Sequence, residues 1–372
     1  MVDTKNSKSV LKEIEWGVVF TELLENPTIT DIKIWHDKII VVDTKLGEFT
    51  LDPSKYTEED YQYALNMRVD LPNKIGTRMK RPFTKGQAIL DGEMLYKDKA
   101  ILRFNAIEGE LTYRNLNALA IRKTNLVFNV DRHNTFDEEY CDRVGLELLL
   151  RAVNRMAGVV IAGPTGAGKT TLARYLATNG ISAQNSVITI EDTFELFLNE
   201  IKSKMKVLAL KSNENFDFIQ LIVTSLRQDP KYILVSESRS VEVLSVMTAA
   251  GSGHPIITTL HASSALAIPW RIVDMSKTTG TDAEHLFRQA HQNVELGVYI
   301  DYDNDKDGSH RKITQIAEFY FDENNECKEH LIYEYDEVQK KYISHQIQSQ
   351  SLRNKLAKKG ADISMFRQAG LL

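Results

Sequence analysis

One glycine-rich segment of the chain has the residue types and spacing of a phosphate-binding loop. It reads Gly163-Pro-Thr-Gly-Ala-Gly-Lys-Thr170 and fits the pattern G-x-x-x-x-G-K-[S/T] at every fixed position. Glycines at 166 and 168 let the backbone wrap a phosphate, so that successive N–H groups point at it. Lys169 is placed to reach the β- and γ-phosphates of a nucleotide, and the Thr170 hydroxyl to take one position on Mg²⁺.

The residues on either side predict the strand–loop–helix setting without which the pattern carries little weight. The apolar run 159–162 predicts a buried strand, and 171–177 predicts a helix that ends at Asn179-Gly180. The alternative, a glycine-rich turn with an exposed lysine, is disfavoured by this setting. We therefore predict that the whole loop binds nucleotide through Gly163, Pro164, Thr165, Gly166, Ala167, Gly168, Lys169, Thr170 and Thr171.

Acidic residues follow two other apolar runs that predict strands. Glu237 ends the run 232–236, and Glu191 and Asp192 follow 186–190. Because ligands bind at the carboxyl ends of parallel strands, these acids are expected near the glycine-rich loop. Glu237 is the candidate to hold a metal-bound water or to act as its general base. For the other two acids, orienting water or metal and standing solvated at a strand end are equally compatible with the sequence.

A histidine ends a further predicted strand. His261 closes the run 255–261, seven residues after His254. A histidine beside a nucleotide can sense the γ-phosphate by hydrogen bonding, whereas a lone histidine is more often structural. The residues alone leave both interpretations open.

Composition excludes several classes of protein. The 372 residues carry a net charge of −5, unlike proteins that coat nucleic acid non-specifically, although a local basic patch stays possible. Two cysteines, Cys141 and Cys327, fit a reducing compartment and form no disulfide framework or zinc cluster. No apolar run approaches the ~18 residues that span a bilayer, and the first residues lack the apolar core of a signal peptide. We therefore expect a cytoplasmic protein that meets a membrane only through partners.

The pattern of elements predicts two domains. Residues 1–133 mix short β-rich runs with a helix, as in an α+β domain, and 134–372 alternate strands and helices, as in a largely parallel sheet covered on both faces. A capping box from Thr135 to Glu138 starts the second domain. The predicted strands are 28–35, 38–43, 46–51, 101–106, 117–122, 159–162, 186–190, 232–236, 255–261, 295–300 and 312–321, and the predicted helices are 58–69, 135–156, 171–177, 216–228, 241–250 and a tail from 345 to 372.

Four motifs in one order resemble the secretion ATPase superfamily, which powers type II and type IV secretion, conjugation, and type IV or Tad pilus assembly. Residues 163–170 resemble its Walker A loop, and Ile-Glu-Asp-Thr-Phe-Glu-Leu at 190–196 resembles its Asp box. Leu-Arg-Gln-Asp-Pro at 226–230, continuing through Glu237 to Arg239, resembles its Walker B motif, and 248–262 resembles its His box. The resemblance covers at least residues 159–320.

The resemblance implies ATP and Mg²⁺ as ligands, and a RecA-like P-loop NTPase domain with a mainly parallel sheet after a smaller α+β N-terminal domain. The catalytic candidates that it implies are Lys169, Glu237, Glu191 and His261. The metal ligands that it implies are Thr170, Glu191 and Glu237. Segments 102–106 and 119–123 resemble the N-terminal arginine segments of the family, so Arg103 and Arg122 are implied to approach the γ-phosphate. A solvated strand face is the alternative for both arginines.

The resemblance also implies a homo-hexamer, inner-membrane subunits of a secretion or pilus machine as partners, and a cytoplasmic location at the inner face of the membrane. Two positions depart from the pattern, because Ser236 replaces the usual glycine before the Walker B acid and Lys231 follows the proline where aspartate is common. The four-cysteine zinc module of many type II members is absent, which favours the type IV or Tad branch. Nucleic acid is not predicted as a direct partner.

Two other functions stay open. A DNA-handling P-loop motor would need a basic groove with aromatic residues. A nucleotide-binding scaffold without hydrolysis is hinted at only by Ser236 and Lys231.

Overall fold

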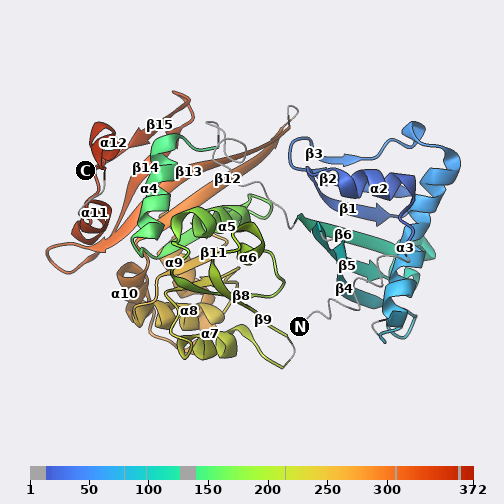
Figure 1. Cartoon of the computed structure of the whole chain (residues 1–372), viewed down its shortest axis with the longest axis horizontal. Coiled ribbons are helices and arrows are strands. Elements are labelled where there is room, and N and C mark those ends of the chain that lie inside the picture. Colours follow the sequence, from blue (N-terminus) through green and yellow to red (C-terminus); the bar gives the residue numbers. More distant parts are fainter. Residues whose placement is uncertain are drawn as a thin grey trace. The chain divides into compact units, whose positions relative to one another are not determined.

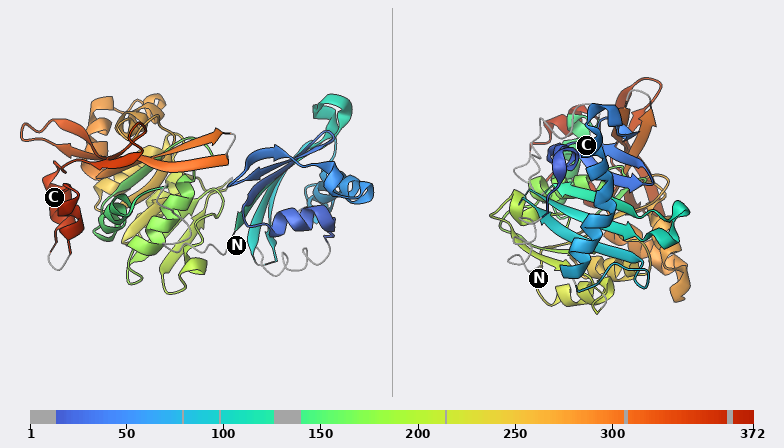
Figure 2. Two further views of the ribbon diagram at one scale, coloured as in Figure 1. Left: turned by 90° about the horizontal axis from the view of Figure 1, so that it is seen from above. Right: turned by 90° about the vertical axis from the view of Figure 1, so that its right-hand side faces the viewer.

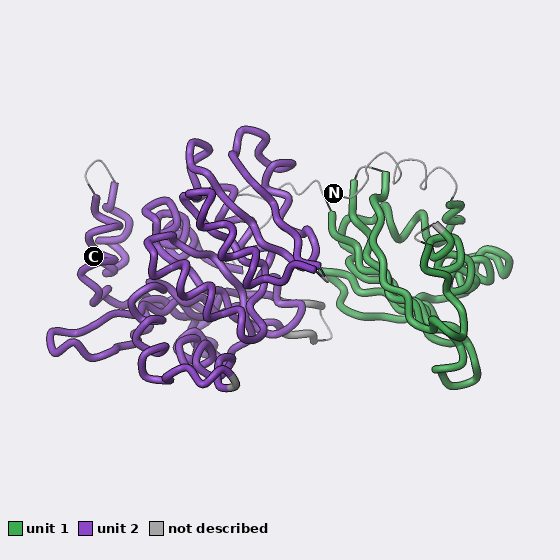
Figure 3. The backbone as a smooth tube through the Cα atoms, turned by 90° about the horizontal axis from the view of Figure 1, so that it is seen from below, with its two compact units in different colours: residues 1–128, 304–310 green, residues 129–303, 311–372 purple. Residues whose placement is uncertain are grey.

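The computed structural model describes residues 14–78, 80–97, 99–125, 140–213, 215–305, 308–358 and 362–372. The chain divides into two compact units, residues 1–128 with 304–310 and residues 129–303 with 311–372 (Figure 3). The domain boundary predicted at 133/134 and the capping box predicted from Thr135 to Glu138 lie outside the described residues.

The N-terminal unit is built on a six-stranded antiparallel sheet with the strand order β3-β2-β1-β6-β5-β4 (Figure 1). The strands are β1 Ile29–Trp35, β2 Lys38–Asp43, β3 Gly47–Thr50, β4 Ile89–Tyr96, β5 Ala100–Ile107 and β6 Ala118–Asn125. Along β5 and β6 buried and less buried residues alternate, as expected of a sheet with one face packed and one face polar.

Two helices, α2 (Gly17–Glu25) and α3 (Glu58–Arg78), cover the packed face of this sheet, and Figure 2 shows α3 crossing it. Phe20 of α2, Leu71 of α3 and Phe104 of β5 belong to one buried cluster. Short 3-10 turns lie at 53–55, 109–111 and 113–115. The unit is therefore α+β, with its helices on one side of an antiparallel sheet.

The second unit contains a nine-stranded mixed sheet in the order β15-β14-β13-β12-β7-β11-β10-β8-β9. Neighbouring strands from β12 through β9 pair in parallel, while β13, β14 and β15 form an antiparallel extension. The strands are β7 Val159–Ala162, β8 Ser186–Glu191, β9 Lys206–Lys211, β10 Tyr232–Val235, β11 Ile256–Leu260, β12 Leu296–Asp305, β13 Gly308–Phe321, β14 Cys327–Asp336 and β15 Lys341–Ser344.

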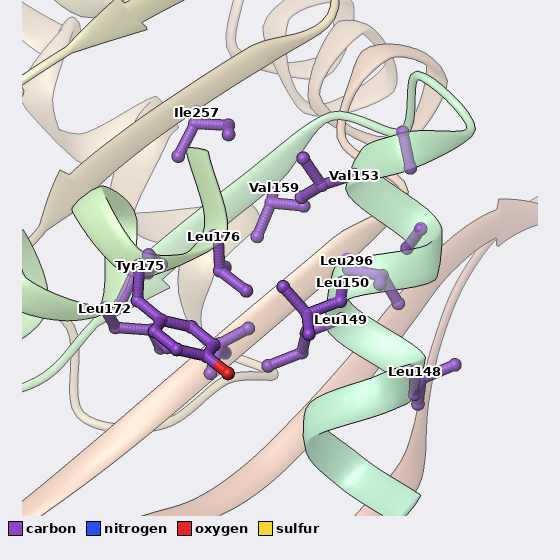
Figure 4. Close-up of a cluster of buried hydrophobic side chains, with 14 of the residues drawn as sticks. Leu148, Leu149, Leu150, Val153, Val159, Leu172, Tyr175, Leu176, Ile257 and Leu296 are labelled. Carbon is purple, nitrogen blue, oxygen red and sulfur yellow. The ribbon is translucent and has the colours of Figure 1, made fainter. Parts of the chain in front are cut away.

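Helices cover both faces of the nine-stranded sheet. They are α4 Arg143–Asn154, α5 Lys169–Gly180, α6 Leu198–Ile201, α7 Phe218–Leu226, α8 Glu242–Gly251, α9 Ile268–Met275, α10 Ala283–Asn293, α11 Gln350–Leu356 and α12 Ser364–Gln368, with a 3-10 turn at 277–279. Val159 and Ile161 of β7 join a buried cluster with α4 and α5, seen in Figure 4, whereas Val160 and Ala162 join one with α8, α9 and α10. A strand buried on both faces is apolar throughout, which explains the unbroken run 159–162.

Several element boundaries differ from the sequence predictions. The helix predicted from 135 begins at Arg143 instead, because the Asp142 carboxylate accepts the Gly145 N–H at 2.9 Å and caps the helix there. Helix α3 continues to Arg78, past Pro72, because its apolar face extends through Leu71 and Ile75 into the core. The tail contains two short helices, α11 and α12, in place of a continuous one.

Among the described helices, none combines the length and the apolar character needed to cross a membrane.

Candidate functional site

The glycine-rich loop connects the end of β7 to the start of α5 and needs glycine for its backbone path. Gly163, Gly166 and Gly168 have φ values of 153°, 82° and 88°, a region that other residues rarely adopt. A Cβ on Gly163 would also come within 2.4 Å of the Ile300 carbonyl oxygen on β12. The sequence pattern and the observed backbone therefore agree at each of these glycines.

Lys169 places its ammonium group inside this loop. Its Nζ donates to the carbonyl oxygens of Gly163 at 2.9 Å and Pro164 at 3.0 Å. Burial lowers the pKa of Lys169, and the nearby Glu237 carboxylate opposes that shift. Thr170 and Thr171 lie in the first turn of α5, where backbone N–H groups and the helix dipole favour an anion.

The four motifs lie at the carboxyl ends of four neighbouring strands of the sheet. β7, which carries the loop, pairs with β11, β11 pairs with β10, and β10 pairs with β8, all in parallel. Their carboxyl ends lead to the loop at 163–170, to His261, to Glu237 and to Glu191-Asp192. The predicted clustering of these motifs at one edge of a parallel sheet is thus what the topology produces.

A chain of side-chain contacts joins these strand ends. The Lys169 ammonium lies 3.4 Å from Nδ1 of His261, and Nε2 of His261 lies 3.0 Å from Oε1 of Glu237. Because a lysine can only donate, His261 accepts at Nδ1 and its ring proton lies on Nε2, facing the carboxylate. Glu237 is thus oriented by His261 and linked through it to the Lys169 ammonium.

Arg239, which the sequence analysis placed in a motif but not among the site residues, continues this chain. Its Nε and Nη2 donate to Oε2 of Glu237 at 2.9 and 2.7 Å, and its Nη1 lies 3.4 Å from the Asp192 carboxylate. The hydrogen bond to Glu237 raises the pKa of Arg239. One feature of the sequence indicates this role of Arg239. It stands two residues after the Walker B acid, from where its guanidinium can reach the carboxylate.

Glu191 does not take part in this chain of contacts. Its side chain is 1% exposed, and its Oε2 accepts the backbone N–H groups of Glu195 at 2.8 Å and Leu196 at 3.0 Å. Its Oε1 accepts the Thr189 hydroxyl at 2.9 Å, and burial raises the pKa of the carboxyl group. The geometry therefore gives Glu191 the role of holding the turn after β8, and Asp192 is the acid of this pair that faces Arg239. The catalytic and metal-binding roles predicted for Glu191 stay predictions.

Substituting Glu191 separates these two roles. Glu191→Ala is expected to lower the free energy of unfolding by about 2–4 kcal/mol, because two backbone N–H groups lose their acceptor. Glu191→Gln keeps an oxygen at that position, so its melting temperature and turnover are expected to stay close to those of the wild type. Circular dichroism and a phosphate-release assay check both variants, and a large loss of turnover in folded Glu191→Gln would support the predicted catalytic role.

Arg103 and Arg122 lie in the N-terminal unit, directly opposite each other on β5 and β6. A row of charged residues crosses the sheet here, because Glu93 pairs with Arg103 and Asp31 pairs with Arg122. Arg122 Nε donates to Asp31 Oδ1 at 2.8 Å, with the arginine side chain 56% exposed. The structure thus brings the two predicted arginines together, on the face of the sheet opposite α2 and α3.

The residues of the loop fit a nucleoside triphosphate with Mg²⁺. The positive φ values of the glycines let the backbone wrap a phosphate. The Lys169 ammonium donates to two loop carbonyl oxygens, which an anion can replace. Thr170 is the second residue of α5, and it stands where the loop pattern places the hydroxyl that would bind the metal. Thr170 would hold Mg²⁺ through its hydroxyl, and the ion would neutralise charge on the phosphate oxygens.

Comparison with known proteins agrees with these motifs. Residues 120–294 match the family model described as type II/IV secretion system protein. An uncharacterized protein of Bacillus anthracis is 27% identical over 262 residues, which cover 70% of this chain and 56% of that protein. The type IV pilus retraction ATPase PilT of Pseudomonas aeruginosa is 37% identical over 119 residues, which cover 32% of this chain and 34% of that protein. The chain thus spans about half the length, or less, of these curated relatives.

A solved structure is similar over nearly the whole chain. The ATPase DotB of Legionella pneumophila matches with a TM-score of 0.54 at 16% identity, over 98% of this chain and 85% of that chain. At this identity the likeness is one of fold. Together with the two sheets described above, it confirms the predicted fold class, a RecA-like P-loop domain with a mainly parallel sheet preceded by a smaller α+β domain.

Proposed function

The chain carries a type II/IV secretion family domain over residues 120–294, as the order of its motifs predicts, and we propose that it binds ATP with Mg²⁺ and hydrolyses it. The observation that carries the proposal is the contact chain from Lys169 through His261 to Glu237. It links a group that binds phosphate to a carboxylate that can act on water. A phosphate-release assay on the purified protein tests the proposal, and no release above background with ATP and Mg²⁺ would refute it.

Each residue of the chain has a distinct role in the proposed reaction. Lys169 and the loop N–H groups bind the β- and γ-phosphates, and Thr170 holds Mg²⁺, which neutralises phosphate charge when bound. Glu237 orients the attacking water and draws its proton. His261 fixes the carboxylate of Glu237 and sits beside Lys169, where it can respond to the γ-phosphate.

The serine before Glu237 does not disturb the backbone that places this acid. Ser236 N–H donates to the Ile190 carbonyl at 3.0 Å, and its own carbonyl accepts the Thr259 hydroxyl at 2.7 Å. The end of β10 is thus held from both neighbouring strands. This supports a hydrolase over the nucleotide-binding scaffold that Ser236 had suggested, and the same phosphate-release assay separates the two.

We propose further that Arg103 and Arg122 neutralise charge that develops on the γ-phosphate. Arg122→Ala is expected to lower turnover about tenfold or more and to change nucleotide affinity by less than about threefold, because such arginines act mainly in the transition state. Steady-state kinetics and nucleotide titration measure the two effects.

Asp31→Asn provides the matched control for Arg122→Ala. It removes the ion pair of Arg122 and keeps the arginine, so turnover close to that of the wild type is expected. If Arg122→Ala turns over normally, Arg122 is a solvated residue of the strand face and the assignment is lost.

The proposed pathway is ATP-powered transport of macromolecules or pilus assembly at a membrane machine, in the type IV secretion or Tad branch. A homo-hexamer and inner-membrane subunits are the proposed partners, with the chain at the cytoplasmic face of the membrane. Support comes from the family match over 120–294 and from the motif order. Sedimentation with ATP and Mg²⁺ tests the hexamer, and a monomer under all conditions would contradict it. DNA-stimulated hydrolysis would favour a DNA-handling motor instead.

A further inference from the structure

The strands β12 and β13 bring two side chains against the phosphate loop from outside the family motifs. β12 pairs in parallel with β7 up to Tyr299 opposite Ala162, so its continuation runs beside the loop. Tyr302 on β12 lies against Gly166, where a Cβ would stand 3.5 Å from the tyrosine ring. Arg311 on β13 lies against the same segment, 3.7 Å from where a Cβ on Gly168 would be.

The Arg311 guanidinium makes two contacts, one with an aromatic ring and one with the loop backbone. The group lies over the Tyr302 ring at 4.7 Å from its centroid, and its Nε donates to the Gly166 carbonyl oxygen at 2.9 Å. A charged donor makes a stronger hydrogen bond than a neutral one, and a planar guanidinium stacked on an aromatic ring is restricted in direction. Tyr302 therefore aims Arg311 at the loop.

The hydrogen bond to Gly166 also fixes the next N–H group. In a trans peptide the C=O and the following N–H point in opposite directions, so a Gly166 carbonyl held on Arg311 turns the Ala167 N–H inward. That N–H reaches the Pro164 carbonyl at 3.3 Å, and the same carbonyl accepts from the Lys169 ammonium at 3.0 Å. The N–H side of this peptide thus faces the carbonyl oxygen to which Lys169 also donates.

We propose that Arg311, seated on Tyr302, is a positioning residue that keeps the phosphate loop in its anion-binding form. The inference rests on the proposed nucleotide binding and adds residues outside the four motifs to it. Arg311 acts through the loop backbone, and its charge beside the loop adds to the attraction for phosphate. Loss of Arg311 therefore weakens nucleotide affinity and leaves the rate at saturating nucleotide nearly unchanged.

The variant Arg311→Ala tests the proposal. Its affinity for Mg·ADP is measured by isothermal titration calorimetry. The dissociation constant is expected to rise about tenfold or more, in line with a hydrogen bond from a charged group. Millimolar guanidinium ion is expected to restore part of the affinity in Arg311→Ala and none in Lys169→Ala. Unchanged affinity in folded Arg311→Ala would overturn the proposal.

Arg288→Ala is the matched control. Arg288 also stacks on an aromatic ring, Phe321 at 4.8 Å, and also donates to a carbonyl oxygen, that of Asn325 at 3.1 Å, but it lies on α10, away from the loop. Its loss is expected to change the dissociation constant less than about twofold. An equal weakening in both variants would mean a general effect of losing a stacked arginine and would also overturn the proposal.

Arg311→Lys keeps the test decisive if the alanine variant does not fold. It retains the charge and loses the planar fork, so weakened binding is expected, and binding like that of the wild type would refute positioning by the guanidinium.

The wild type separates this inference from the proposed function. If wild-type protein does not bind Mg·ADP, the nucleotide site itself is wrong, whereas normal wild-type binding with an unaffected Arg311→Ala removes only the role of Arg311.

Discussion

Replacing Lys169 by alanine is expected to abolish ATP turnover and to weaken nucleotide binding about a hundredfold or more, as loss of a charged group at the phosphates implies. The ammonium is buried inside the loop and held by the carbonyl oxygens of Gly163 and Pro164. A triphosphate offers a stronger acceptor at that place, so the lysine turns from the loop to the ligand. Alanine leaves the loop without its central cation, and titration with Mg·ATP measures the loss.

A second lysine in the same unit provides the control for this variant. Lys202 is half-buried and, like Lys169, donates to a backbone carbonyl, that of Thr178 at 3.0 Å, but it is not part of the loop. Lys202→Ala is expected to bind and hydrolyse ATP normally. If Lys169→Ala binds Mg·ATP with wild-type affinity, the assignment of the nucleotide site to residues 163–170 is wrong.

Glu237→Gln is expected to bind ATP normally and to hydrolyse it about 10²–10⁴ times more slowly, the usual range for losing a general base. The amide keeps the size of the side chain and can still accept from Arg239, but it cannot take a proton from water. The contact with His261 also changes, because an amide NH₂ cannot accept from the ring N–H. Binding titration and single-turnover hydrolysis separate the two effects.

Glu334→Gln tests whether losing any glutamate–histidine pair has the same consequence. Glu334 accepts from His345 at 2.8 Å on β14, in the antiparallel extension of the sheet, several strands away from β10. Its turnover is expected to match that of the wild type. Normal hydrolysis by Glu237→Gln would contradict the assignment of Glu237 as the general base.

The central strands could be predicted from sequence because burial on both faces leaves an unbroken apolar run. β7 and β10 are such runs, and each ends at a motif. The edge strand β9 (Lys206–Lys211) is mostly exposed or half-buried and carries no comparable signal, so it was missed. The start of α4 differs from the prediction because Asp142, which lies inside the predicted helix, caps its amino end, so that the helix begins at Arg143.

The site could be predicted at the level of strand ends but not of individual side chains. Glu191 and Asp192 are neighbours at the end of β8, and neighbouring residues of an extended chain point to opposite sides. Sequence therefore could not tell which one turns inward to hold the chain at 195–196 and which one faces Arg239. The contacts of Arg311 and Tyr302 depend on how a distant hairpin lies beside the loop, which no local pattern encodes.

The lysine, arginine and acidic side chains in the row from Lys169 to Asp192 carry equal numbers of positive and negative charges. Two cations, Lys169 and Arg239, alternate with two anions, Glu237 and Asp192, and His261 lies between Lys169 and Glu237. An arriving triphosphate therefore finds no surplus of positive charge in this row. The positive charge that offsets the phosphates therefore has to come from the amino end of α5, from Arg311 and, above all, from a divalent ion that enters with the nucleotide. Nucleotide affinity is thus expected to depend steeply on the concentration of free Mg²⁺.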